Sequence, residues 1–212
     1  MIAVYTCITD GFGDVLYDPL TIEDGIEYFC FTNKEVKSNV YKILPLPYNL
    51  SNNRRNSRFP KINSHIVFPT SEITIWHDGI YQIKSIKSLL KSLKDNWNFC
   101  TFKHSSRSSV IEEVRACCIQ KKENPNILNN QYKSYVLEGF SDNCLFENSC
   151  LIRKNNSVVK DINNLWWSEY QKWSCRDQIS LPYVFWKLDY KDVTLIEGKR
   201  FDNDFFKFRE HK

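Results

Sequence analysis

The chain has 212 residues with a hydrophobic fraction of 42%, which predicts one globular domain and excludes a disordered protein. Its 29 basic and 25 acidic residues leave a net charge of +4, which suits a phosphate-bearing ligand but is too small for a nucleic-acid-binding protein, so we expect no DNA or RNA partner. No apolar run is long enough for a membrane span, and the first residues lack the features of a signal peptide.

The eight cysteines are scattered along the chain without a CxxC pair, and most lie in apolar segments such as 28–31. Buried free thiols in a reducing compartment explain this pattern best. We therefore expect a cytoplasmic protein.

Three strands are expected near the start of the chain, over 2–9, 26–32 and 40–46, because β-branched and aromatic residues are concentrated there. The first strand ends in a glycine-containing loop that does not carry the GxGxxG pattern of dinucleotide-binding proteins. Consecutive strands with short connections predict the start of a mixed sheet.

The polar segment 51–68 holds four cations within eight residues. In a helix, Arg54, Arg58 and Lys61 would share one face, but Pro60 favours a helix that begins close to it, which would separate the two arginines from the lysine. A run of cations is usually a solvated surface. Its position just before the strand 73–79 favours a phosphate-binding role for Lys61 and Arg58.

The segment 73–79 is a short β-branched strand that leads directly into Asp78 and Gly79. Ligands of open α/β sheets bind beyond the carboxyl ends of strands, where an acid can hold a divalent cation together with a nucleotide diphosphate. Asp-Gly is also a frequent turn pair, so a turn without a ligand is the alternative.

After residue 79, the hydrophobic pattern predicts helices over 82–95, from Ser108 or Ser109, over 125–137 and from about 158, of which the first is amphipathic. It predicts strands over 98–102 and 193–196, and two short strands at 145–148 and 150–153 about a turn. His104 and Arg107 precede a helix N-terminus, where the sequence is equally compatible with an anion site and a capping loop. Asp177 precedes the apolar run 179–188, where it is either a helix cap or an acid that faces a cleft.

Several blocks of the sequence, taken in order, carry a resemblance to a known family. They are Ile2-Ala3-Val4-Tyr5-Thr6, Tyr28-Phe29-Cys30-Phe31-Thr32-Asn33, Arg58-Phe59-Pro60-Lys61, Ile75-Trp76-His77-Asp78-Gly79, Lys103-His104, Ile152-Arg153-Lys154-Asn155 and Arg176-Asp177-Gln178. Over nearly its whole length the chain resembles a group of plant and bacterial glycosyltransferase-like proteins, some of which are linked to the synthesis of cell-wall polysaccharides. It is also similar to the N-terminal glycosyltransferase domain of a multi-domain chlorovirus protein associated with capsid glycans.

The resemblance implies an α/β protein with a GT-A fold, in which helices flank a Rossmann-like mixed central β-sheet. A single GT-A domain would occupy residues 1–212 and could be the first domain of a longer protein. The implied activity is metal-dependent transfer of a sugar from a UDP-sugar to a glycan or glycoprotein acceptor, with UDP-rhamnose or UDP-glucose as the donors to try. Retention of configuration and a role in viral capsid glycan synthesis are further expectations.

The resemblance also implies a cofactor and its ligands. Mn²⁺ or Mg²⁺ would be held by Asp78 and His211, although a solvated tail residue is the alternative for the histidine. Trp76-His77-Asp78 stands where such enzymes commonly have Asp-x-Asp, so one acid of the motif is missing. Lys61 and Arg58 would support the diphosphate. The other implied nucleotide-binding residues are Thr6, Phe31, Thr32, Trp76 and His77.

Asp177 and Glu147 are the implied candidates for catalysis, because carboxylates near the reacting sugar stabilise an oxocarbenium-like transition state. Trp166, Trp167 and Trp173 could stack on acceptor sugars, although core packing is the commoner role of tryptophan.

Two rival functions use the same features. A nucleotide-sugar hydrolase or phosphodiesterase would pass the substrate to water, and a non-catalytic glycan-binding module would need neither metal nor nucleotide.

Overall fold

The computed structural model describes residues 1–11, 14–50 and 52–209. Within them the strands are β1 Ile2–Ile8, β2 Ile26–Thr32, β3 Lys42–Pro45, β4 Ile73–His77, β5 Tyr81–Ile83, β6 Phe99–Lys103, β7 Phe146–Lys154, β8 Val193–Leu195 and β9 Phe206–Phe208. The helices are α1 Asn53–Ile62, α2 Ser64–Val67, α3 Ile86–Ser92, α4 Val110–Ile119, α5 Pro125–Leu137, α6 Ser157–Lys172 and α7 Asp177–Lys187.

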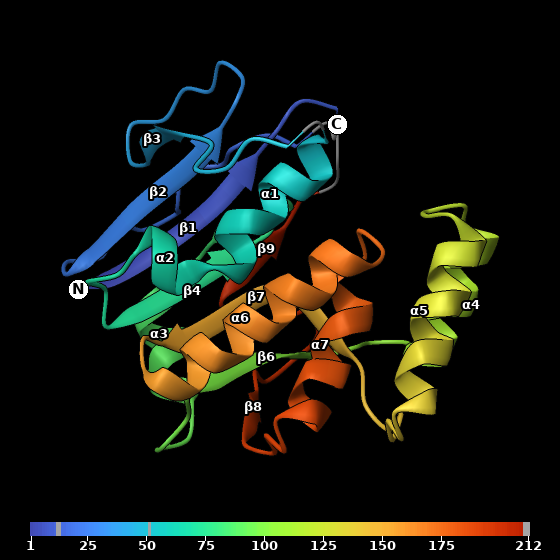
Figure 1. Cartoon of the computed structure of the whole chain (residues 1–212). Coiled ribbons are helices and arrows are strands. Elements are labelled where there is room, and N and C mark those ends of the chain that lie inside the picture. The colour runs from blue at the N-terminus through green and yellow to red at the C-terminus, as the bar shows by residue number, and fades with distance from the viewer. Residues whose placement is uncertain (12–13, 51, 210–212) are drawn as a thin grey trace.

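Within the described residues, seven strands form one mixed sheet in the order β3-β2-β1-β4-β7-β6-β8 (Figure 1). Strands β5 and β9 form a separate pair. Strand β1 pairs in parallel with β2 and β4, while β7 runs antiparallel between β4 and β6. The prediction of a mixed central sheet flanked by helices is confirmed. The carboxyl ends of β1, β2, β4 and β6 meet the start of β7 at one edge, where ligand sites of such sheets form.

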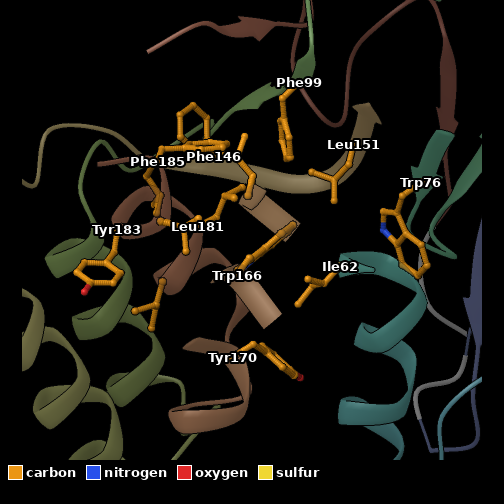
Figure 2. Close-up of a cluster of buried hydrophobic side chains, with 14 of the residues drawn as sticks. Ile62, Trp76, Phe99, Phe146, Leu151, Trp166, Tyr170, Leu181, Tyr183 and Phe185 are labelled. Atoms are coloured by element: carbon orange, nitrogen blue, oxygen red, sulfur yellow. The ribbon is translucent and has the colours of Figure 1, made fainter. Parts of the chain in front are cut away.

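The two faces of the sheet bury different clusters, because successive side chains of a strand point to opposite faces. Tyr5 and Trp76 belong to the cluster shared with α1, α6 and α7. Figure 2 shows Trp76 in this cluster together with Ile62 and Trp166. Val4 and Ile75 belong to the cluster shared with α3 and the β5–β9 pair. Trp166 is fully buried in the first cluster, so core packing is its role.

Helix α1 begins at Asn53, and the prediction of a start close to Pro60 is wrong. The Asn52 side chain caps the helix by accepting hydrogen bonds from the backbone N–H groups of Arg54 and Arg55. Pro60 lies inside the helix and is buried, so packing offsets the loss of its N–H group. As a result, the cations on both sides of this proline lie on one helix.

Strand β7 is continuous over nine residues, so the prediction of two short strands about a turn is wrong. Glu147 and Asn148 suggested a turn because they are polar, yet both are buried. Tertiary partners replace water there, since Glu147 accepts hydrogen bonds from Ser105 and Arg200. Asn148 has a φ of 41°, a left-handed conformation that asparagine tolerates.

The helix predicted over 82–95 is shorter in the structure, where residues 81–83 form β5 and only Ile86–Ser92 is helical. Strand β9, which the sequence did not predict, pairs antiparallel with β5. The rings of Tyr81 and Phe206 stack with their centroids 4.9 Å apart. Pairing with a distant segment therefore overrides the local amphipathic pattern.

The expectation of free, mostly buried thiols is confirmed, because all eight cysteines are free and six of them are buried. None of the helices in the described part of the chain combines the length and the apolar character that a membrane crossing requires.

Candidate active site

A cavity of about 220 Å³ lies at the carboxyl ends of β1 and β4. The residues that line it include four arginines and two aspartates, namely Arg54, Arg58, Arg176, Arg200, Asp14 and Asp78. A larger cavity of about 350 Å³ lies between α7 and the edge strand β8, and aromatic side chains such as Phe146, Phe185 and Trp186 line it. The smaller cavity is the candidate active site, because the charged groups converge there and the sheet topology favours that edge.

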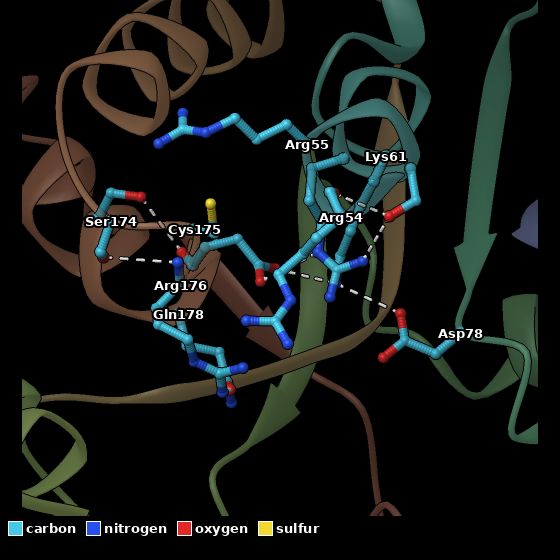
Figure 3. A network of polar contacts seen from close by, with 12 residues as sticks. Arg54, Arg55, Lys61, Asp78, Ser174, Cys175, Arg176 and Gln178 are labelled. Carbon is cyan, nitrogen blue, oxygen red and sulfur yellow. Dashed lines mark hydrogen bonds and ion pairs between the residues drawn. The ribbon is translucent and has the colours of Figure 1, made fainter. Parts of the chain in front are cut away.

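Asp78 follows directly after β4, and two other predicted site residues, Lys61 and Trp76, contact its carboxylate. Its Oδ1 atom accepts a hydrogen bond from Nε1 of Trp76 at 2.8 Å. The same atom lies 3.3 Å from Nζ of Lys61 (Figure 3). The backbone N–H of Asp78 donates to the carbonyl of Ser149 on β7 at 2.8 Å. The Asp78 side chain is 30% exposed, whereas that of Lys61 is 2% exposed, so the carboxylate remains open to the cavity.

Asp177, at the start of α7, joins the same group of charges from behind the cavity wall. Its Oδ2 lies 2.9 Å from Nζ of Lys61, and its Oδ1 lies 3.3 Å from Nε of Arg58. Burial by itself would raise the pKa of Asp177, but Lys61 and Arg58 outweigh it and hold that pKa well below its usual range. Asp177 is therefore ionised at neutral pH and cannot serve as a general acid.

Arg153 on β7 fixes the end of α1 that carries Lys61. This fully buried guanidinium donates to the backbone carbonyls of Lys61 and Ile62 at 2.6 and 3.0 Å, and to the Tyr5 hydroxyl at 2.6 Å. Burial lowers its pKa. The last carbonyls of a helix have no partner within the helix, so Arg153 supplies the missing donors. The arginine of the Ile152-Arg153-Lys154-Asn155 block thus supports the site without entering it.

His77 lies on the opposite face of the sheet from Trp76 and does not line the cavity. Its Nδ1–H donates to the backbone carbonyl of Asp78 at 3.1 Å, and its Nε2 accepts a hydrogen bond from the Tyr41 hydroxyl at 3.0 Å. Burial lowers the pKa of His77 to about 4, so the ring is neutral. His77 therefore contacts the backbone of Asp78, the candidate metal ligand, and not its carboxylate.

The predicted nucleoside contacts Thr6, Phe31 and Thr32 do not line this cavity. Phe31 packs against Tyr5 and Phe68 in the core, Thr6 is fully buried, and the Thr32 hydroxyl donates to the carbonyl of Lys34. Cys7, which follows Thr6 directly, and Thr9 do line the cavity. Burial raises the pKa of the Cys7 thiol, so it presents a neutral group.

Glu147 is buried behind the wall and does not line the cavity. Its partner Arg200 does, as do Arg176, Asp14 and Arg54, none of which was among the predicted site residues. Arg176 stands next to Asp177 in a block that the sequence singled out, so it could have been found. Arg200 comes from the loop between β8 and β9, and no local pattern marks it.

The capping-loop alternative holds at the strand-to-helix junction before α4. Nδ1 of His104 accepts hydrogen bonds from the backbone N–H groups of Ser106 and Arg107 at 3.2 and 3.0 Å. The first N–H groups of the helix donate to the Asp142 carboxylate, which occupies the place that an external anion would take.

A divalent cation would have oxygen ligands in this cavity. The hydrogen bonds that the Asp78 carboxylate accepts from Trp76 and Lys61 both fall on Oδ1. Asp14 lines the same wall next to Gly79, where an added Cβ would lie 3.0 Å from Cβ of Asp14. Mg²⁺ and Mn²⁺ accept one or two carboxylates together with waters and substrate phosphates. The described residues contain no group of three or more acidic, cysteine or histidine side chains arranged as a metal site, and His211 lies outside them.

Residues 3–211 match the family of the TOD1/MUCI70 glycosyltransferase-like domain. The chain belongs to this family. MUCI70 of Arabidopsis thaliana, described as a probable hexosyltransferase, is 25% identical to this chain over an alignment of 216 residues. The alignment covers 86% of this chain and 37% of that relative. The chain thus spans little more than a third of that TOD1/MUCI70 protein. The prediction that the chain belongs to a family of plant and bacterial glycosyltransferase-like proteins is confirmed.

The fold of this TOD1/MUCI70 domain also has a counterpart among solved structures. The apo structure of the bifunctional glycosyltransferase WbbM covers 92% of this chain and 38% of its own, with a TM-score of 0.51 and 9% identity. A glycosyltransferase involved in glycosylation of the major capsid of PBCV-1 covers 81% of this chain and 66% of its own at a TM-score of 0.37 and 11% identity, which is too distant to support an argument. The glycosyltransferase fold predicted from the sequence is confirmed by the first match.

Proposed function

We propose that this TOD1/MUCI70 domain is a metal-dependent glycosyltransferase that moves a hexosyl group from a UDP-sugar to a glycan acceptor. The observation that supports the proposal most is the convergence of arginines from three parts of the chain with Asp78 on one cavity. Planar guanidinium groups match phosphate oxygens in charge and geometry. Because 220 Å³ is less than a typical pocket for a whole ligand, the cavity would hold the diphosphate and leave the sugar at its mouth.

The metal would supply a positive charge beside the leaving diphosphate. Asp78, with Asp14 in the same wall, would hold it, and His211 remains a predicted further ligand. Lys61 and Trp76 fix the Asp78 carboxylate from two sides, so little reorganisation is needed when a ligand enters. Arg58 carries a guanidinium in the wall that can donate to the phosphates.

Asp177 would act on the reaction through its charge. Its carboxylate neutralises part of the charge of Lys61 and Arg58 and holds both side chains in place. Retention of configuration, the transfer of a rhamnosyl or glucosyl group, a viral capsid glycan as acceptor and a cytoplasmic location remain predictions. A direct catalytic role for Asp177 also stays a prediction.

The test is calorimetric titration with UDP, GDP, CMP and dTDP, each with and without Mn²⁺, supported by thermal shifts. We expect UDP to bind selectively and only with the metal. Asp78→Asn should abolish this metal-dependent binding while leaving the melting temperature nearly unchanged, and Asp189→Asn, an exposed acid beside Lys191, is the matched control. Undiminished UDP binding by the Asp78→Asn protein would contradict the proposed metal role.

The same proteins separate the rival functions. Stoichiometric hydrolysis of a UDP-sugar that is as fast as transfer would favour a hydrolase. Binding of free glycan without nucleotide or metal, together with no response to any nucleotide, would favour a glycan-binding module.

A further inference from the structure

Three arginines of the cavity wall share one arrangement in the described part of the chain. Each is held from behind by a buried carboxylate that belongs to another segment and does not itself line the cavity. The pairs are Arg58 with Asp177, Arg176 with Glu113, and Arg200 with Glu147.

Glu113 on α4 holds Arg176 in this way. Its Oε1 lies 3.2 Å from Nη2 of Arg176, and its Oε2 lies 2.7 Å from Nε of Arg107. Its side chain is 1% exposed. Burial alone would raise the pKa of Glu113, but a hydrogen bond from Cys117 and the two arginines lower it, so the carboxylate is ionised.

Glu147 on β7 holds Arg200 in the same way. Its Oε2 accepts a hydrogen bond from Nη1 of Arg200 at 3.0 Å, and its Oε1 accepts from the backbone N–H and the hydroxyl of Ser105 at 3.2 and 3.0 Å. Its side chain is 1% exposed, whereas that of Arg200 is 28% exposed. Both oxygens of Glu147 are thus engaged inside the protein.

The Arg176 and Arg200 side chains remain partly exposed, although the carboxylates that hold them are buried. Arg176 is 15% exposed and Arg200 is 28% exposed, against 1% for Glu113 and for Glu147. A guanidinium group has five N–H donors, and one carboxylate takes only part of them. Both arginines line the cavity, where phosphate oxygens would accept hydrogen bonds from the remaining donors.

We propose that Arg176 and Arg200 bind the diphosphate of the nucleotide sugar, and that Glu113 and Glu147 are positioning residues that orient them. This inference rests on the proposed function. It assigns to Glu147 a role that differs from the catalytic one predicted from the sequence, because its carboxylate faces Ser105 and Arg200 and not the cavity.

The experiment is calorimetry with UDP and Mn²⁺ on the whole chain. Arg200→Ala should raise the Kd for UDP by about tenfold or more, as the loss of a charge-assisted hydrogen bond does. Glu147→Gln should raise it by about tenfold, in the range known for outer-shell partners. Because Glu147 acts through Arg200, the double variant should bind no more weakly than Arg200→Ala alone. An unchanged Kd in Glu147→Gln, or additive effects in the double variant, would overturn the assignment.

Arg176→Ala and Glu113→Gln form the parallel test and should behave in the same way. Glu138→Gln, which changes an exposed acid paired with Lys187, is the control and should bind UDP like the wild type. Should Glu147→Gln not fold, Arg200→Lys keeps a charge beside Glu147 but loses the planar fork, and it should still weaken UDP binding.

The outcomes separate this inference from the proposed function. If the wild type binds no nucleotide with or without Mn²⁺, the proposed function fails and this assignment fails with it. If the wild type binds UDP and the Arg176→Ala and Arg200→Ala proteins bind it equally well, only the assignment of the two arginines fails.

Discussion

The Lys61 ammonium lies 2.9 Å from Oδ2 of Asp177, and the two side chains are only 2% and 5% exposed. This buried ion pair joins the end of α1 to the start of α7. The same ammonium lies 3.3 Å from Oδ1 of Asp78, so the pair also sets the position of the candidate metal ligand at the end of β4. The stability of the fold and the geometry of the site therefore depend on one cation.

Lys61→Met should lower the free energy of unfolding by about 3–5 kcal/mol, because it leaves the Asp177 carboxylate buried without its nearest cation. Urea unfolding followed by circular dichroism measures this change. Lys191→Met is the matched control, since Lys191 and Asp189 form a pair whose side chains are 80% and 83% exposed. It should cost less than about 1 kcal/mol. A loss below about 1 kcal/mol in Lys61→Met would contradict the importance of the buried pair.

Acid should destabilise the protein through Asp177. Its pKa is lower in the folded chain than the value of about 3.9 expected when unfolded, so the unfolded state binds more protons and stability rises with pH in this range. The contribution of the Asp177 carboxylate to the free energy of unfolding is fully present above about pH 5, and it is lost as the pH falls toward the pKa of Asp177 in the folded chain. Unfolding free energies measured from about pH 5 to pH 3 should fall less steeply in Asp177→Asn than in the wild type. Equal slopes would show that Asp177 titrates normally.

His77 should produce a second pH dependence at higher pH. Its pKa falls to about 4 in the fold, against about 6.5 when unfolded, so its contribution to stability is present above about pH 6.5 and is lost as the pH falls toward 4. His77→Gln removes this titration, and the unfolding free energy should vary less between about pH 6.5 and 4. His65 and His104 also have lowered pKa values, so part of the slope should remain. An unchanged slope in His77→Gln would rule out the neutral buried ring.

Gly79→Ala should weaken metal-dependent UDP binding. An added Cβ would lie 2.7 Å from Cδ1 of Ile8 and 3.0 Å from Cβ of Asp14, so the wall of the cavity must shift, at a cost of about 1–3 kcal/mol. Calorimetry and thermal unfolding measure the two effects. Gly25→Ala is the control. Gly25 has a φ of +83°, which alanine adopts only with strain, but no atom lies within 4 Å of the added Cβ. The Gly25→Ala protein should therefore lose stability while its UDP binding is unchanged. Equal UDP affinity in Gly79→Ala and the wild type would mean that the wall does not need this close approach.

Local sequence was sufficient for most of the elements. The strands 2–9 and 26–32 and the helices at 125–137 and from Asp177 were predicted close to their observed bounds, since periodicity and end signals agree there. The errors occur where distant partners decide. Residues 146–154 are one strand because buried partners satisfy Glu147, and 81–83 are a strand because β9 pairs with them. In both places tertiary hydrogen bonds outweigh the local pattern.

From the residues alone it follows that Asp78 ends a strand and that Arg58 and Lys61 precede it, because a β-branched run that meets Asp-Gly ends there and exposes the acid. Which other charged side chains join them at the cavity depends on how distant segments pack together. Arg176 and Arg200 reach the cavity from the N-cap of α7 and from the loop before β9, and each is aimed by a carboxylate that lies more than fifty residues away in sequence. A cavity assembled from such separate segments leaves no periodic signal in the chain, since its geometry arises from the packing of α4, α7 and β7 around the sheet edge.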